Sequence, residues 1–238
     1  MTALRSPILE ELATTGRAML NPFTRRQIVD IRAHLWSREV YTDAHVPIGA
    51  IREGRGAIAR TMLPSDCECF CTSTRDAILT PHVLERALSL TDIAADYVGR
   101  NPPVMYSMNA FWTRPGPKET RSDIQEFHID PDDTRFVALF LFLTDVDNDA
   151  AQELTGPDGI RRGMTGPAGT VFLADTSHSH RGKKPRYGER GIMWVRWGAS
   201  DQPAANISDE IKPIDAALLG ERYPRDLSLR ESIKLLVR

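Results

Sequence analysis

The sequence predicts a mostly β fold with helical cover, and three observations support this prediction. Before position 100 apolar residues recur with helical spacing, whereas after it short apolar runs alternate with turn-forming residues. The run 136–143 is apolar on both faces, which is typical of a strand covered on both sides. Several short strands after flanking N-terminal helices favour a double-stranded β-helix, the jelly-roll or cupin-like double sheet.

We expect the 238 residues to form a single domain, 1–238, because sandwiches and barrels often run about 200–250 residues as one unit. With 41% apolar residues the chain can bury a sizeable core. The helical cover would lie mainly in 1–100, the β core in about 101–200, and a C-terminal extension in 201–238 that packs back as short helices.

The helical cover is predicted from three segments. Apolar residues from Ile8 to Met19 follow a weak helical pattern, and Thr24 can cap a stronger helix. The apolar stripe of that second helix comprises Ile28, Ile31, Leu35 and Trp36. A further helix is expected from about Pro81 to Val98, because proline suits a first turn and Gly99 provides a helix stop.

The β core is predicted from apolar and β-branched runs after position 100. The expected strands are Val104 to Thr113, the segment around His128, Phe136 to Leu143, Thr170 to Ala174, and Gly191 to Gly198. The polar, glycine-rich stretch from Asp145 to Gly169 is predicted to be loop with one short strand. Residues 41–66 show little periodicity and indicate short strands and loops.

His128 and Asp130 are the central candidates for chemistry. In an extended strand they point to the same face and can supply two neighbouring metal ligands. A second histidine from a distant strand would complete two histidines and one carboxylate, a set with open positions that suits non-haem Fe(II). Both His178 and His180 could serve; we prefer His180, because it lies next to Arg181 and leaves the shorter step to Arg190.

Arg190 is the candidate for binding an anion beside that metal. A guanidinium offers a fixed, always-charged fork for a carboxylate, as the far end of a dicarboxylic cosubstrate requires. Arg196 shares a face with Arg190 in a regular strand and is a rival for this role. Asn109 and Gln125 are candidates for contacts to the cosubstrate or to the metal ligands, and equally for ordinary strand polar groups.

Composition bounds the partners and the compartment. A formal net charge of −2 argues against nucleic acid or an anionic membrane, and leaves a small molecule as the expected partner. The cluster of Cys67, Cys69 and Cys71 lacks the usual zinc spacing and gives no disulfide framework, so we interpret it as packing residues in a reducing compartment. Without a leader or a long apolar run, we expect a cytoplasmic protein.

The chain resembles the phytanoyl-CoA dioxygenase family of Fe(II)/2-oxoglutarate-dependent oxygenases. The resemblance rests on His128 to Phe136, Leu143 to Asp147, Gly166 to Thr176, His180 to Gly182, and Arg190. It implies that His128, Asp130 and His180 bind Fe(II) and that Arg190 binds the distal carboxylate of 2-oxoglutarate. It also implies use of O2 and release of succinate and CO2.

The expected reaction is hydroxylation of a small metabolite or natural-product intermediate, with desaturation, ring closure and epimerisation left open. Two other classes of protein compete with this hypothesis. One is a cupin-like metal-dependent enzyme that catalyses no oxidation. The other is a binding protein that keeps the fold without catalysis.

Overall fold

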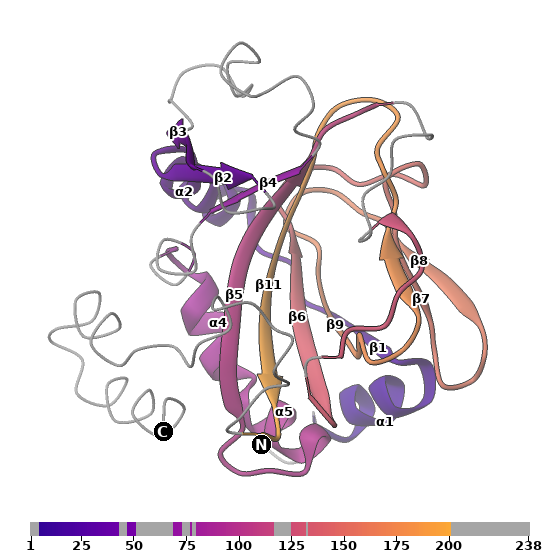
Figure 1. Ribbon diagram of the computed structural model, residues 1–238. Coiled ribbons are helices and arrows are strands. Elements are labelled where there is room, and N and C mark those ends of the chain that lie inside the picture. The colour runs from indigo at the N-terminus through magenta and orange to yellow at the C-terminus, as the bar shows by residue number, and fades with distance from the viewer. Residues whose placement is uncertain are drawn as a thin grey trace, which may run out of the picture.

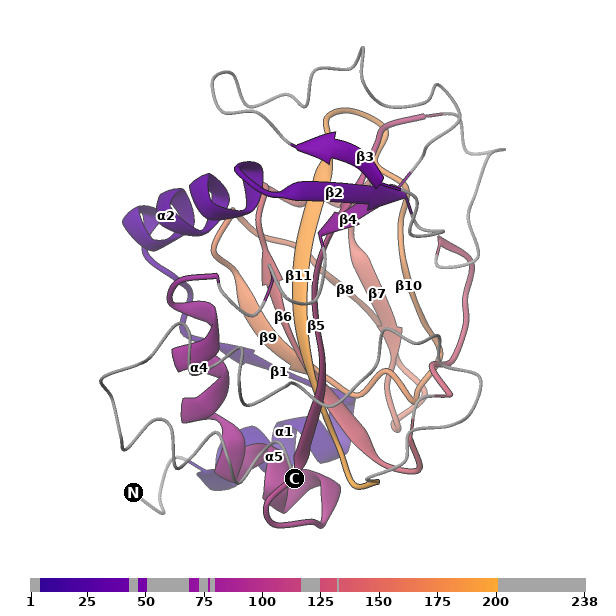
Figure 2. The ribbon, with the colours of Figure 1, turned by 60° about the vertical axis from the view of Figure 1, so that its left-hand side comes forward.

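A computed structural model describes residues 5–42, 47–50, 69–72, 77, 80–116, 125–131 and 133–200 of the chain. The described chain forms two antiparallel sheets, a large one and a small one, with helices beside the large sheet (Figure 1). Figure 2 shows the helices on one side of the large sheet and the small sheet on the other. The space between the two sheets holds the candidate site.

The large sheet has eight strands in the order β1, β9, β6, β11, β5, β4, β2, β3. Their bounds are Arg17–Leu20 (β1), Glu39–Thr42 (β2), Pro47–Ala50 (β3), Cys69–Thr72 (β4), Val104–Thr113 (β5), Phe136–Phe142 (β6), Val171–Ala174 (β9) and Arg190–Gly198 (β11). Strand β11 lies centrally and pairs with β5 on one side and β6 on the other. Its side chains therefore alternate between the helical face and the site.

The small sheet has three strands in the order β10, β7, β8. Their bounds are Gln152–Thr155 (β7), Arg161–Met164 (β8) and His180–Gly182 (β10). Strand β10 pairs with β7 so that His180 lies opposite Leu154 and Gly182 opposite Gln152. This register brings the second candidate histidine to the inner face of the small sheet.

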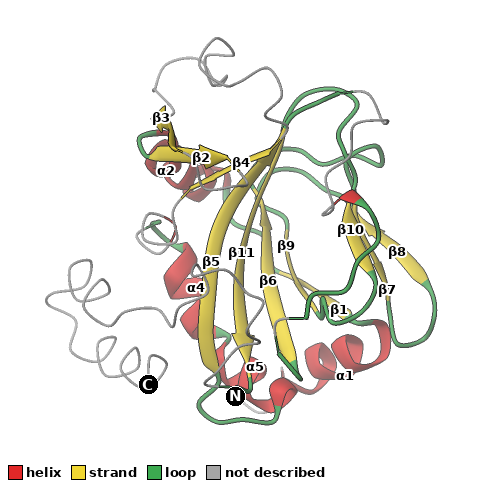
Figure 3. Cartoon of the chain, viewed as in Figure 1, coloured by secondary structure: helices red, strands yellow, loops and turns green. Residues whose placement is uncertain are grey.

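Four helices are described: α1 (Arg5–Thr15), α2 (Arg25–Trp36), α4 (Val83–Ser89) and α5 (Thr91–Val98), coloured red in Figure 3. Thr24 closes a capping box with Gln27 at the start of α2, as its position in the sequence predicted. Gly99 ends α5 with φ 76°, the left-handed conformation that glycine adopts at little cost. Among the described residues, no helix is long and apolar enough to cross a membrane.

Two apolar clusters explain why the strands of the large sheet are buried on both faces. On β6, Val137, Leu139 and Leu141 pack toward the helices. The alternate residues Ala138, Phe140 and Phe142 pack into the space between the sheets. Because successive strand residues point to opposite faces, one apolar run serves both layers, and the double-sheet fold is confirmed.

The structure corrects three element predictions. The helix expected to reach Met19 ends at Thr15, and β1 follows after Gly16, whose φ of 74° makes the turn. The helix expected from Pro81 to Val98 is two helices that meet at Leu90. The stretch 145–169 holds two strands, β7 and β8, rather than one, because this polar hairpin buries only alternate residues of β7.

One further expectation is wrong, and others concern residues that the structure does not describe. The segment at His128 is not a regular strand: it makes an isolated β-bridge. The helices expected in 207–238, Cys67, and most of 41–66 lie outside the described residues.

Candidate metal centre

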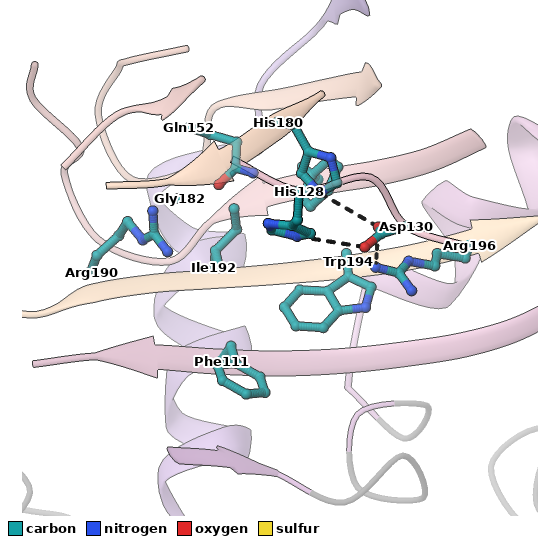
Figure 4. Close-up of a pocket in the computed structure, with 11 residues that line it drawn as sticks. Phe111, His128, Asp130, Gln152, His180, Gly182, Arg190, Ile192, Trp194 and Arg196 are labelled. Atoms are coloured by element: carbon teal, nitrogen blue, oxygen red, sulfur yellow. Dashed lines mark hydrogen bonds and ion pairs between the residues drawn. The ribbon is translucent and has the colours of Figure 1, made fainter. Parts of the chain in front are cut away.

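A cavity of about 170 Å³ lies between the two sheets (Figure 4). One strand, β11, contributes four alternate residues to its wall, Arg190, Ile192, Trp194 and Arg196. The other lining residues are Phe111, His128, Asp130, Phe140, Gln152, His180 and Gly182. The wall therefore combines six polar or charged residues with apolar surface from Phe111, Phe140, Ile192 and Trp194, and such a combination suits a small-molecule site.

The backbone brings the two candidate histidines together across 52 residues of sequence. His128 and His180 exchange both backbone hydrogen bonds, each 2.9 Å from nitrogen to oxygen. The backbone N–H of Asp130 donates to the carbonyl of Thr176 at 3.1 Å. The His128 segment therefore adds to the edge of β10 and carries Asp130 with it.

Backbone carbonyls orient both imidazole rings. His128 Nδ1 lies 2.9 Å from the carbonyl oxygen of Glu126, and His180 Nδ1 lies 3.0 Å from that of His178. A carbonyl oxygen only accepts hydrogen bonds, so each Nδ1 carries the proton and donates. The Nε2 atom of each ring is then the one that can bind a metal, which is the arrangement found in metal-ligating histidines.

Both Nε2 atoms face the carboxylate of Asp130. His128 Nε2 lies 3.6 Å from Oδ1, and His180 Nε2 lies 3.5 Å from Oδ2. Nitrogen and oxygen ligands bind at about 2.0–2.2 Å, so two ligands of one ion lie at most about 4.4 Å apart. The candidate ligand atoms of all three side chains lie within 4.8 Å of one another, so with a small adjustment they could hold a single divalent cation.

The surroundings of Asp130 and His180 favour the ionisation states that a metal requires. Burial acts to raise the pKa of Asp130, but Arg196 and His180 outweigh it and hold this pKa below its ordinary value. Burial lowers the pKa of His180, an effect that the Asp130 carboxylate partly offsets. Metal binding requires an ionised carboxylate and a neutral imidazole, and these shifts favour both.

Arg196 holds the carboxylate from the side away from the histidines. Its Nη2 donates to Asp130 Oδ2 at 2.8 Å, and only 14% of its side chain is exposed. The sequence left Arg196 as a rival of Arg190 for the cosubstrate carboxylate. In the structure it instead pairs with Asp130 and fixes the orientation of that candidate ligand.

Arg190 lies at the opposite end of the same strand face and has no acidic partner among the described residues. It is 3% exposed, and its donors reach only Thr113 Oγ1 and the carbonyl of Ala150, both at 3.4 Å. Within the described part of the chain its Nε has no hydrogen-bond partner. Burial lowers the pKa of Arg190 to about 10. A buried, underpaired guanidinium facing a cavity suits an anionic ligand.

The loop that leads to His180 is fastened to α5. Tyr97 donates its hydroxyl to Asp175 Oδ2 at 2.6 Å. The other oxygen of Asp175 accepts from the backbone N–H and the hydroxyl of Ser177. The turn between β9 and β10 is therefore held at its first residue, five positions before the candidate ligand.

The remaining sequence candidates lie outside the cavity wall. Asn109 lies half-buried on β5 opposite Trp194, and Gln125 is buried with its amide donating to Cys69 Sγ at 3.8 Å. Their roles as cosubstrate contacts stay predictions. His178 points toward Asp175 at 3.9 Å, whereas His180 joins the cluster. Cys69 and Cys71 are buried free thiols on β4.

Sequence reasoning missed Gln152, Phe111 and Phe140, which line the cavity. Phe111 and Phe140 lie in predicted strands, and alternation along those strands could have placed them on the cavity face. Gln152 begins a strand that the polar composition concealed, so no signal in the sequence marked it.

Comparison with solved structures defines the class of fold. The chain has the double-stranded β-helix fold of non-haem, 2-oxoglutarate-dependent enzymes, which confirms the fold expected from the motifs. No protein-family model matches the sequence, and a search of curated proteins found no match. The structural likeness therefore carries the comparison.

Three particular neighbours illustrate it. The non-haem α-ketoglutarate-dependent epimerase SnoN from nogalamycin biosynthesis has a TM-score of 0.57 at 12% identity, over 90% of this chain and 95% of its own. HygX from Streptomyces hygroscopicus, solved with nickel, 2-oxoglutarate and hygromycin B, has a TM-score of 0.54 at 11% identity, and the match covers 82% of this chain and 87% of HygX. AviO1 from Streptomyces viridochromogenes Tue57 has a TM-score of 0.54 at 17% identity, and the match covers 84% of this chain and 97% of AviO1.

Proposed function

We propose that this protein is a non-haem Fe(II)- and 2-oxoglutarate-dependent dioxygenase. The observation that carries the proposal is the convergence of two imidazole Nε2 atoms on the Asp130 carboxylate inside a cavity. Two histidines and one carboxylate leave positions open on the metal, as O2 chemistry requires. The shared fold with SnoN and HygX supports the same class.

In this proposal His128, Asp130 and His180 hold the iron, and Arg190 binds the distal carboxylate of 2-oxoglutarate. Bound iron would supply O2 activation coupled to decarboxylation of 2-oxoglutarate to succinate and CO2. The chain itself orients the ligands through the carbonyls of Glu126 and His178. Phe111, Phe140, Ile192 and Trp194 place apolar surface beside the reacting groups.

The substrate class that we propose is a small metabolite or natural-product intermediate, oxidised by hydroxylation as the default outcome. The neighbours support a small organic substrate: one SnoN structure holds nogalamycin RO, and one HygX structure holds hygromycin B. SnoN is an epimerase and SnoK a carbocyclase, so the same fold serves other outcomes as well.

Succinate formation is the direct test of this function. The purified protein is loaded anaerobically with Fe(II), mixed with 2-oxoglutarate and exposed to O2, and succinate is quantified with each component omitted in turn. Even without the substrate that is oxidised, we expect slow conversion of 2-oxoglutarate to succinate. This conversion should require Fe(II), 2-oxoglutarate and O2 together. A metal-dependent enzyme without oxidative chemistry, or a binding protein, would form no succinate.

A variant pair assigns this activity to the site. Asp130→Ala should abolish succinate formation while its circular dichroism spectrum stays that of the wild type. Asp149→Ala removes an exposed carboxylate from a nearby turn and should leave turnover unchanged. Full activity in Asp130→Ala would remove the metal assignment.

A further inference from the structure

Gln152 is a buried amide that the proposed function has not yet used. It is 7% exposed, begins β7, and lines the cavity. Among the residues that the structure describes, none forms a hydrogen bond with its side chain. The amide faces the cavity with its hydrogen-bonding groups available, so a ligand that binds there can pair with it.

The register of the small sheet places Gln152 beside Arg190. Gln152 lies opposite Gly182, and partners across an antiparallel pair present their side chains to the same face. Gly182 has no side chain, and Arg190 fills that place. A Cβ built on Gly182 would overlap Arg190 Nη2. The amide and the guanidinium therefore line the same cavity, and in Figure 4 Gln152 lies between Arg190 and the two histidines.

The neighbouring residues of β7 confirm which way Gln152 faces. Leu154, two positions on, packs in the apolar cluster between the sheets. Glu153, between them, points outward and accepts from Arg181 Nε at 2.8 Å. Because side chains alternate along the strand, the side chain of Gln152 points into the cavity and that of Glu153 points to the outer face.

We propose that Gln152 is a second positioning residue for the distal carboxylate of the cosubstrate. Its amide N–H donates to the carboxylate that Arg190 binds, so that two buried and underpaired groups are satisfied by one ligand. A carboxylate accepts up to about four hydrogen bonds, and the guanidinium fork supplies two. This inference rests on the proposed function, because it takes 2-oxoglutarate as the ligand.

Binding of two 2-oxo acids to nickel-loaded protein tests the assignment by calorimetry. 2-Oxoglutarate has the distal carboxylate and pyruvate lacks it, while both present the same 2-oxo acid group to the metal. Gln152→Leu should raise the Kd of 2-oxoglutarate about tenfold or more, the effect of losing one hydrogen bond to a charged group. The Kd values of pyruvate and of nickel should stay unchanged.

Two further variants sharpen the test. Gln152→Glu should weaken 2-oxoglutarate more than Gln152→Leu does, because its carboxylate would pair with Arg190 in place of the ligand. Glu153→Gln is the matched control, because it also exchanges an amide and a carboxylate of equal size, but on the outer face of β7. It should leave the affinity for both 2-oxo acids at the wild-type value.

The outcomes separate this inference from the proposed function. If Gln152→Leu binds 2-oxoglutarate within twofold of the wild type, or weakens pyruvate equally, Gln152 does not contact the distal carboxylate. Wild-type protein that binds neither acid overturns both proposals. Wild-type protein that binds 2-oxoglutarate through Gln152 but forms no succinate with Fe(II) and O2 overturns the proposed function alone.

Discussion

Arg190 carries a buried charge that lowers the stability of the free protein and that, in our proposal, binds an anionic ligand. The side chain is buried with two long hydrogen bonds and an unpartnered Nε, and burial lowers its pKa to about 10. Because the guanidinium is still charged at neutral pH, the fold contains a desolvated cation that its described neighbours do not neutralise. Such a group stabilises a complex with an anion rather than the free protein.

Replacing Arg190 by an apolar residue of similar length should therefore stabilise the free protein and abolish cosubstrate binding. We expect Arg190→Met to raise the free energy of unfolding by about 1–3 kcal/mol, since a buried charge is replaced by packing. Urea unfolding measures this gain, and calorimetry measures the loss of 2-oxoglutarate binding. Arg190→Lys is the control that keeps the charge and should show no gain. An Arg190→Met variant that is less stable and still binds 2-oxoglutarate would contradict this account.

A side chain at position 182 would force the Arg190 guanidinium to shift, because the guanidinium occupies the space that a Cβ would need. We expect Gly182→Ala to cost about 1–3 kcal/mol of stability through overpacking and to weaken 2-oxoglutarate binding by displacing Arg190. Gly163→Ala in β8 is the matched control, since its Cβ would meet only Ala151 at 3.5 Å. Equal stability and equal binding in the two variants would show that the close approach has no consequence.

At the scale of elements, the first residue of β10 and the bridged segment at His128 bring the candidate ligands together above the inner face of β11. The strands of the large sheet were predictable because apolar residues occupy both of their faces, as in β6. The bridge between His128 and His180 was not predictable, because backbone pairing between distant segments leaves no local pattern. The fastening of the loop after β9 by Tyr97, a residue of α5, escaped the sequence for the same reason.

Removing the Tyr97 hydroxyl tests whether this fastening positions His180. Burial and the Asp175 carboxylate raise the pKa of Tyr97, so the hydroxyl stays protonated and donates. Tyr97→Phe should cost about 1–3 kcal/mol of stability and weaken metal binding about tenfold. Tyr187→Phe, at a side chain that is 78% exposed, is the control and should change neither value. Unchanged metal affinity in Tyr97→Phe would mean that the loop holds His180 without this hydrogen bond.

At the scale of the whole molecule, the sequence predicted the fold and the three residues that the structure brings together as candidate metal ligands, but not the cavity that surrounds them. The spacing of His128 and Asp130 and the buried runs carried the prediction, since both are local patterns. The pairing of Arg196 with Asp130 and the place of Gln152 depend on how two sheets face each other. Such contacts follow from the packing of strands that are remote in sequence.

The stability of the metal-free protein should depend on pH through His180. Burial lowers the folded-state pKa of this imidazole below its ordinary value of 6.5. The unfolded chain then takes up the proton at a higher pH than the folded chain does, so the stability contribution is present above about pH 6.5. It is lost as the pH falls through the lowered folded value. Urea unfolding at several pH values between 7.5 and 5 should show this decline, and a His180→Asn variant should show a shallower one. Parallel profiles for the two proteins would contradict the assignment.

The stoichiometry of Fe(II) binding tests the central claim most directly. Anaerobic equilibrium dialysis of the wild type against Fe(II) should give one tightly bound ion per chain, and the folded Asp130→Ala variant should bind none at the same free concentration. Equal iron content in the two proteins, or a wild-type chain that retains no iron, would contradict a metal centre built from His128, Asp130 and His180.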